Sequence, residues 1–291
     1  MKYRFYVLAA ALLFSTGGAA IKATTLTSWQ VASLRSLIAA IVLLVLLPEA
    51  RRLRSPQVWV ASIAYAATLV LFVLANKLTT AANAIFLQAT APFYLLAIGP
   101  FLLKEPNRFR DYVLGGVMAI GMACFLCDSS SASELAPNPA LGNALAAATG
   151  LTWALTVTAL RGLSKREGAS GLPVVSAGNL VAFAVAIPFA LPLSGVGSAD
   201  LTVLLYLGIF QIGLAYFCMT RGVKHVPAFE ASVLILLEPA MNPVWTFLIH
   251  DERPGPLALL GGGIIMASTL AHTLSAPATA TPPQTPQSPP D

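Results

Sequence analysis

Long apolar runs separated by short polar breaks cover most of this chain. The breaks, such as PEARRLRSP, KEPNRFRD and DERPGP, combine charged residues with proline and therefore favour turns. Each run is long enough to cross a bilayer as a helix, and a helix satisfies its backbone hydrogen bonds within one segment. The pattern predicts an all-α polytopic membrane protein with ten spans, at residues 5–21, 30–47, 57–75, 82–103, 111–127, 140–160, 172–193, 201–219, 229–249 and 256–274.

The first run also has the features of a cleavable signal peptide. In MKYRFYVLAAALLFSTGGAA a short apolar core follows basic residues and precedes small ones. The apolar stretch continues to Ile21, however, and a helix of that length can cross a bilayer with some tilt. We therefore expect the helix to be retained as the first span.

Composition and cysteine usage narrow the class further. Hydrophobic residues make up 57 % of the chain and charged residues 10 %, whereas an average soluble domain has about 25 % charged residues. The formal net charge of +5 comes from basic residues in the short breaks, so it predicts membrane topology and no nucleic-acid partner. The three cysteines lie in apolar runs without a histidine cluster, so we expect no metal site and no cofactor.

The basic residues predict the orientation of the chain in the membrane. Alternate breaks place thirteen Lys and Arg residues on one side and three on the other, and the richer side is expected to face the cytoplasm. The thirteen are Lys2, Arg4, Arg51, Arg52, Arg54, Lys104, Arg108, Arg110, Arg161, Lys165, Arg166, Arg221 and Lys224. The three are Lys22, Lys77 and Arg253. Both termini are therefore predicted to be cytoplasmic, in a multi-pass protein of the cell (inner) membrane.

One pattern occurs twice along the chain. Residues 82–116, ANAIFLQATAPFYLLAIGPFLLKEPNRFRDYVLGG, align without a gap on residues 229–263 at an offset of 147 residues. The offset pairs Pro92 with Pro239, Glu105 with Glu252, Gly115 with Gly262 and Gly116 with Gly263. Each repeat holds five spans, and because five is odd, the second repeat must enter the membrane from the opposite side. The predicted organisation is a repeat at 1–127, an outer linker at 128–139, an inverted repeat at 140–274 and a disordered Pro/Thr/Ser-rich cytoplasmic tail at 275–291.

The repeated strings resemble the two EamA repeats of the drug/metabolite transporter superfamily. The most specific elements are Arg35 in the second span, the Pro92 to Glu105 spacing, and the string Leu237-Glu238-Pro239 followed by Glu252. The resemblance implies ten helices in two inverted five-helix repeats and export of amino acids or related metabolites across the bacterial inner membrane. Two features depart from the family pattern. The usual glycine before each repeat glutamate is Lys104 or Asp251, and Phe14 stands where the first span often has tryptophan.

Two ionisable residues lie inside spans and are the first candidates for function. An ionised side chain at mid-span costs at least about 2.5 to 3.5 kcal/mol, so Arg35 and Glu238 are expected to face a cavity or a partner. For Arg35, capping of carbonyl groups or snorkelling to the headgroups remains the alternative. The remaining substrate-cavity candidates are polar or aromatic: Gln88, Thr90, Trp153, Gln211, Tyr216 and Asn242. Hydrogen bonding between helices is the alternative role for these side chains.

Other residues are assigned structural roles. Pro92 and Pro239 are expected to kink their helices and to act as hinges, because each removes a backbone donor. Glu105 and Glu252 lie at span ends and are predicted to bond helix starts or nearby basic groups. The glycine pairs of the repeat are expected to allow close helix packing, at Gly115, Gly116, Gly262 and Gly263.

The sequence favours a transporter over an enzyme. It contains no HExxH motif, no pair of intramembrane aspartates and no phosphate-cradling glycine-rich loop with lysine. We expect a secondary transporter that exports amino acids or related small metabolites by alternating access driven by a gradient, with protons as a candidate coupling ion. A passive channel or facilitator and a non-transporting membrane scaffold are the alternatives. The sequence leaves the substrate and the oligomeric state open.

Overall fold

A computed structural model describes residues 2–102, 109–127, 134–167, 171–223, 234–235 and 237–275 of the chain. These residues form helices and turns, and no β-strand occurs among them. The helices are α1 (Lys2–Ser15), α2 (Gly17–Lys22), α3 (Ser28–Leu46), η1 (Pro48–Arg51), α4 (Pro56–Leu78), α5 (Ala81–Gln88), α6 (Ala91–Leu102), α7 (Phe109–Cys127), α8 (Pro139–Glu167), α9 (Leu172–Ala190), α10 (Ser198–Leu205), η2 (Tyr206–Leu214), α11 (Ala215–Val223), α13 (Leu237–His250) and α14 (Pro256–Ser275).

The all-helical fold is confirmed, and helical residues lie within each of the predicted apolar ranges. Seven of the described helical segments are long and apolar enough to cross a membrane. They are Lys2–Lys22, Ser28–Leu46, Pro56–Leu78, Ala81–Ile98, Pro139–Leu160, Leu172–Ala190 and Ser198–Gly222. Tyr112–Cys124 and Pro256–Ser268 are shorter apolar helices. The count of ten spans therefore stays a prediction.

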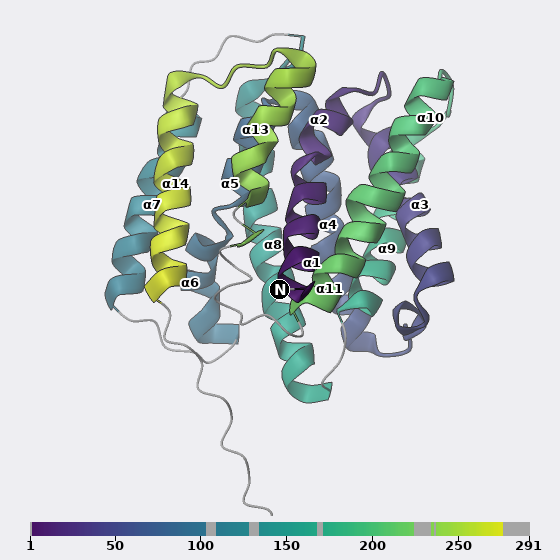
Figure 1. The fold of residues 1–291 in the computed structure, drawn as a ribbon, viewed down its shortest axis with the longest axis horizontal. Coiled ribbons are helices and arrows are strands. Elements are labelled where there is room, and N and C mark those ends of the chain that lie inside the picture. The colour runs from purple at the N-terminus through teal and green to yellow at the C-terminus, as the bar shows by residue number, and fades with distance from the viewer. Residues whose placement is uncertain are drawn as a thin grey trace, which may run out of the picture.

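The helices stand side by side, and those of the first half pack mainly against those of the second (Figure 1). Helix α3 packs against α9 at one side of the bundle, and α7 packs against α14 at the other (Figure 1). The third span of each half packs against the first span of the other half. In one case α4 packs against α8, and in the other α11 packs against α1. The two-repeat organisation is therefore visible in the helix packing as well as in the sequence.

Small residues let α9 approach α4 closely. On α9, a Cβ atom added at Gly178 would lie 2.3 Å from Cδ1 of Tyr65 on α4, so only glycine fits there. Ala177, Ala182 and Ala186 of the same helix are fully buried. In a bilayer, where lipid tails are as apolar as leucine, close packing of this kind holds helices together.

The predicted span at 82–103 is divided in two. Helix α5 ends at Gln88 and α6 begins at Ala91. Thr90 lies at the break, where its hydroxyl donates to the carbonyl of Leu87. Pro92 is the second residue of α6. At the start of a helix a backbone N–H would have no acceptor within the helix, so a proline, which lacks this donor, costs little there. The proline therefore marks a new helix start within the predicted span.

The second repeat shows the same feature. Helix α13 begins at Leu237, and Pro239 is its third residue, again in the first turn. The offset of 147 residues relates Ala91, the first residue of α6, to Glu238. In both repeats, therefore, the repeat proline lies in the first turn of a described helix. Whether these positions act as hinges remains a prediction.

Candidate functional site

Arg35 projects from α3 into the protein interior. Its side chain is 1 % exposed, and Nη2 donates to the carbonyl oxygen of Leu69 on α4 at 3.0 Å. The Nε atom is buried without a hydrogen-bond partner. The guanidinium interacts electrostatically with the hydroxyls of Tyr65 and Tyr216. Among the residues that the structure describes, no carboxylate forms an ion pair with Arg35, so its charge has no counter-ion within that part of the chain.

Tyr216 on α11 contacts the aromatic rings of two other helices. Its ring centroid lies 5.0 Å from that of Phe14 on α1, with an interplanar angle of 69°. Tyr65 on α4 lies at 5.6 Å and 81°. Edge-to-face contacts of this kind are favourable and hold the ring in one orientation. The tyrosine is thus fixed where helices from both halves meet.

Glu238 on α13 lies near the same tyrosine. Its carboxylate and the Arg35 guanidinium are both within electrostatic range of the Tyr216 side chain. Glu238 lies in the first turn of α13, where the partial positive charge of a helix start favours a carboxylate. No described basic side chain pairs with Glu238, and its side chain is half-buried. Arg35 and Glu238 thus both interact with one phenol, but no ion pair between them is found.

A π-helical segment turns three polar or aromatic side chains toward the first helix. In η2 and the start of α11, Tyr206, Gln211 and Tyr216 are five residues apart. A π-helix bonds residue i to i+5, so this spacing keeps side chains on one face, whereas an α-helix would spread them around the axis. The Tyr206 hydroxyl bonds to Oγ1 of Thr16 at 2.8 Å. From the sequence, this stretch was expected to be part of a continuous helical span, and Tyr206 was not among the candidate residues.

The carboxamide of Gln211 lies directly against the backbone of Gly17. A Cβ atom at Gly17 would be 2.9 Å from Nε2 of Gln211. Oε1 of the same side chain is buried and has no hydrogen-bond partner. The glycine therefore makes room for an amide whose oxygen has no hydrogen-bond partner in the surrounding protein.

Asn242 on α13 has the same relationship to Gly18. A Cβ atom at Gly18 would lie 2.9 Å from Oδ1 and 3.0 Å from Nδ2 of Asn242. Asn242 is fully buried, and both of its amide atoms lack a hydrogen-bond partner. It follows Glu238 by four residues, so the two side chains lie on the same face of α13. An unsatisfied buried polar group costs about 1 to 3 kcal/mol, so these amides need an explanation.

The other three predicted cavity residues have their own surroundings. Gln88 ends α5 with a buried, unpartnered Oε1. Thr90 is fully buried beside the backbone of Gly150. Trp153 on α8 packs against the hydrophobic core. In the described part of the chain, no hydrogen bond or ion pair connects these three residues to Arg35 or Glu238.

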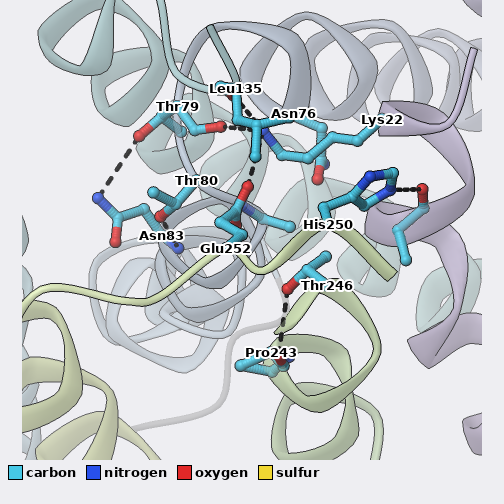
Figure 2. Close-up of polar contacts among 12 residues, drawn as sticks. Lys22, Asn76, Thr79, Thr80, Asn83, Leu135, Pro243, Thr246, His250 and Glu252 are labelled. Atoms are coloured by element: carbon cyan, nitrogen blue, oxygen red, sulfur yellow. Dashed lines mark hydrogen bonds and ion pairs between the residues drawn. The ribbon is translucent and has the colours of Figure 1, made fainter. Parts of the chain in front are cut away.

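A polar network closes the end of the bundle at which α2 terminates, called here the Lys22 end (Figure 2). Nζ of Lys22 pairs with Oε2 of Glu252 at 3.0 Å, and the two side chains are 2 % and 4 % exposed. Lys22 also donates to the carbonyls of Thr79, at 2.9 Å, and of Leu135. Oε1 of Glu252 accepts from the backbone N–H of Ala81, which starts α5, at 2.6 Å. One ion pair thus joins the first helix, the α4–α5 turn and the α13–α14 turn.

Further bonds surround this ion pair. Nζ of Lys77 donates to the carbonyl of Thr24 at 2.6 Å and to its hydroxyl at 3.0 Å. Asp200, at the start of α10, accepts from the backbone and the hydroxyl of Thr25, each at 2.8 Å. From the sequence, Lys22 and Lys77 were predicted only to face the outer side of the membrane, and Asp200 was assigned no role. The sequence does show that these charged residues flank apolar runs, which is the feature that could have indicated a role at the end of the bundle.

The predicted structural residues have different surroundings. Glu105 lies outside the described residues. A Cβ atom at Gly115 would lie 2.2 Å from Cδ1 of Leu96, and one at Gly262 would lie 2.7 Å from the ring of Phe86. At Gly116 and Gly263 an added Cβ would meet nothing within 4 Å. One glycine of each pair therefore lies at a close contact, and the other faces open space.

Comparisons with known proteins agree with this architecture. The threonine/homoserine exporter RhtA of Escherichia coli strain K12 is 26 % identical over 209 residues, which cover 70 % of this chain and 66 % of the exporter. The chain thus spans slightly less than two thirds of that relative. An uncharacterized transporter of Clostridium kluyveri is 37 % identical over 59 residues, or 20 % of this chain and 19 % of the other.

A solved crystal structure has the same fold, with a TM-score of 0.62 and 19 % identity over 94 % of this chain and 96 % of the other. The model of the EamA-like transporter family matches residues 1–127 and 140–274, which together form most of the sequence. The chain therefore belongs to the EamA-like transporter family, within the drug/metabolite transporter superfamily.

Proposed function

We propose that this protein is a secondary transporter that exports amino acids or related small metabolites across the inner membrane by alternating access. The observation that carries the proposal is the placement of two charged side chains near Tyr216. Arg35 is buried and Glu238 is half-buried, both lie within electrostatic range of this phenol, and neither has a described counter-ion. Charges held inside membrane spans without partners are costly, so they are expected to serve a ligand.

An amino acid zwitterion matches these charges. Its carboxylate pairs with Arg35, which offers a free Nε donor. Glu238 either binds the ammonium group or carries the proton exchanged for substrate. The relation to a threonine/homoserine exporter supports an amino acid as the substrate. Export, rather than uptake, rests on that relation.

The proposal includes two inverted repeats of five spans each. It is supported by the bond from Lys22, the last residue of α2, to the carbonyl of Leu135, which shortly precedes α8. The first helix of the first half therefore ends where the first helix of the second half begins, so the two run in opposite directions. Together with the thirteen basic residues expected in the cytoplasm, this orients the Lys22 end toward the outside.

Transport by purified protein in proteoliposomes tests the proposal. Vesicles are loaded with one unlabelled amino acid and supplied with a small amount of the same compound in radiolabelled form, across a panel of amino acids. An exchanging carrier accumulates label transiently by counterflow, and an imposed pH gradient drives net movement. A passive channel conducts without counterflow accumulation, and a scaffold moves nothing above protein-free vesicles. Either of these results would reject the secondary-transport mechanism.

A further inference from the structure

The carboxamides of Gln211 and Asn242 both lie against α2. They belong to different helices of the second half, η2 and α13, and lie against consecutive residues of α2, Gly17 and Gly18. Each is at least nine-tenths buried. Three of their four amide atoms have no hydrogen-bond partner. Two polar side chains thus lie against one short segment of α2, and the protein leaves three of their amide atoms without a partner.

We propose that these two carboxamides recognise a hydroxyl or carboxamide group on the side chain of the transported amino acid. This inference rests on the function proposed above and specifies its substrate class. A carboxamide presents both a donor and an acceptor, and a hydroxyl or a second carboxamide can complement both. An apolar side chain would leave the buried amides unpaired, so the site discriminates against it.

The position of the group relative to the charged residues suits a short side chain. Asn242 follows Glu238 by four residues on one face of α13, or about 6 Å along the helix axis. Gln211 precedes Tyr216 by five residues. The π-helical segment keeps both side chains directed toward α1 and α2. The charged groups bind the backbone of the amino acid, and the amides lie about one helical turn further toward the Lys22 end.

The glycine pair explains how the site is covered. With no side chain at Gly17 or Gly18, the backbone of α2 lies directly on both carboxamides and seals them from solvent. The structure therefore holds this site closed. It opens when α2 moves away from η2 and α13, and such a relative movement of the two halves is what alternating access supplies.

The experiment compares L-threonine with L-valine, which have nearly the same shape and differ in one hydroxyl. Counterflow in proteoliposomes gives kcat/KM for each substrate. The wild-type protein is expected to prefer threonine by about tenfold or more. In Asn242→Leu the preference falls toward one, through loss of threonine transport with valine transport kept. Gln211→Met, which preserves length, is the second variant in case Asn242→Leu does not fold. Gln57→Met, at an exposed position of α4, is the matched control.

Ligand-induced thermal stabilisation of the purified protein separates this inference from the proposed function. Threonine, but not valine, is expected to raise the Tm of the wild type, and the difference disappears in the two variants. If threonine binds selectively but is not moved, the transport proposal fails and the recognition proposal stands. Equal treatment of threonine and valine by the wild type, or an unchanged preference in a folded variant, overturns the recognition proposal. Absence of both binding and transport for every amino acid rejects both proposals.

Discussion

Lys22 and Glu252 form a buried ion pair that joins the two halves of the protein. The 3.0 Å contact connects the end of α2 to the turn before α14, and Glu252 also accepts from the first N–H of α5. We predict a structural role for Glu252. Removing one partner of a buried ion pair costs about 3 to 5 kcal/mol, because the other charge stays buried alone. Glu252→Gln is therefore expected to lower folded yield and Tm, measured by size-exclusion chromatography and thermal unfolding.

The matched control for this prediction is Glu134→Gln, at an exposed position, which should leave yield and Tm unchanged. Substrate affinity of the Glu252→Gln protein that does fold should remain close to that of the wild type. Normal yield combined with a collapse of affinity would assign Glu252 to the substrate site instead.

Glu238→Gln is predicted to abolish gradient-driven transport without lowering folded yield. The substitution keeps the shape of the side chain but removes its charge and its exchangeable proton. Because Glu238 has no described basic partner, no ion pair is broken by the change. The measurement is transport in proteoliposomes under an imposed pH gradient, with Glu134→Gln as the control. Wild-type rates with an intact pH dependence would remove Glu238 from the mechanism.

Tyr216→Phe is predicted to weaken substrate binding while leaving the fold intact. The variant keeps the ring contacts with Phe14 and Tyr65 and loses the hydroxyl, which lies within electrostatic range of Arg35 and Glu238. A hydroxyl that bonds a charged group of the substrate contributes about 1.5 to 3 kcal/mol, so we expect roughly a tenfold to hundredfold rise in KM. Tyr94→Phe on α6 is the comparison variant. An unchanged KM in Tyr216→Phe would place the substrate elsewhere.

The two glycines of the second repeat are predicted to respond differently to alanine. Gly262→Ala places a methyl group 2.7 Å from the ring of Phe86, and overpacking of this kind typically costs about 1 to 3 kcal/mol. At Gly263 the added Cβ meets nothing within 4 Å, so Gly263→Ala should be neutral or stabilising by up to about 1 kcal/mol. Tm measurements of the two variants compare them directly. Equal destabilisation by both substitutions would contradict the packing seen at Phe86.

A reporter fusion tests the predicted orientation. Fused after Leu274, a fluorescent protein that matures only in the cytoplasm should be bright, because both termini are expected there. Asp251→Cys, exposed at the Lys22 end, should react with a membrane-impermeant maleimide added to intact cells, with the native cysteines replaced. A dark fusion, or a cysteine labelled only after lysis, would reverse the assignment.

The sequence by itself determined the all-helical class, the apolar segments and the family. A bilayer demands long apolar segments whose backbone bonds are internal, so hydropathy alone locates helices. The repeat could be found because proline, glutamate and glycine recur at one constant offset, and each has a local role that does not depend on distant contacts. Arg35 and Glu238 stood out for the same reason, since an ionised group inside an apolar run is conspicuous whatever the fold.

Only the tertiary structure decided which groups meet. Lys22 and Glu252 are ordinary charges at the ends of apolar runs until helix packing buries them together. Gln211 and Asn242 become a group because Gly17 and Gly18 admit them from two other helices. The alignment of Tyr206, Gln211 and Tyr216 depends on a π-helical segment, which hydrophobic periodicity does not predict. Contacts between residues far apart in the chain are set by how helices pack, and that information is not contained in any local stretch of sequence.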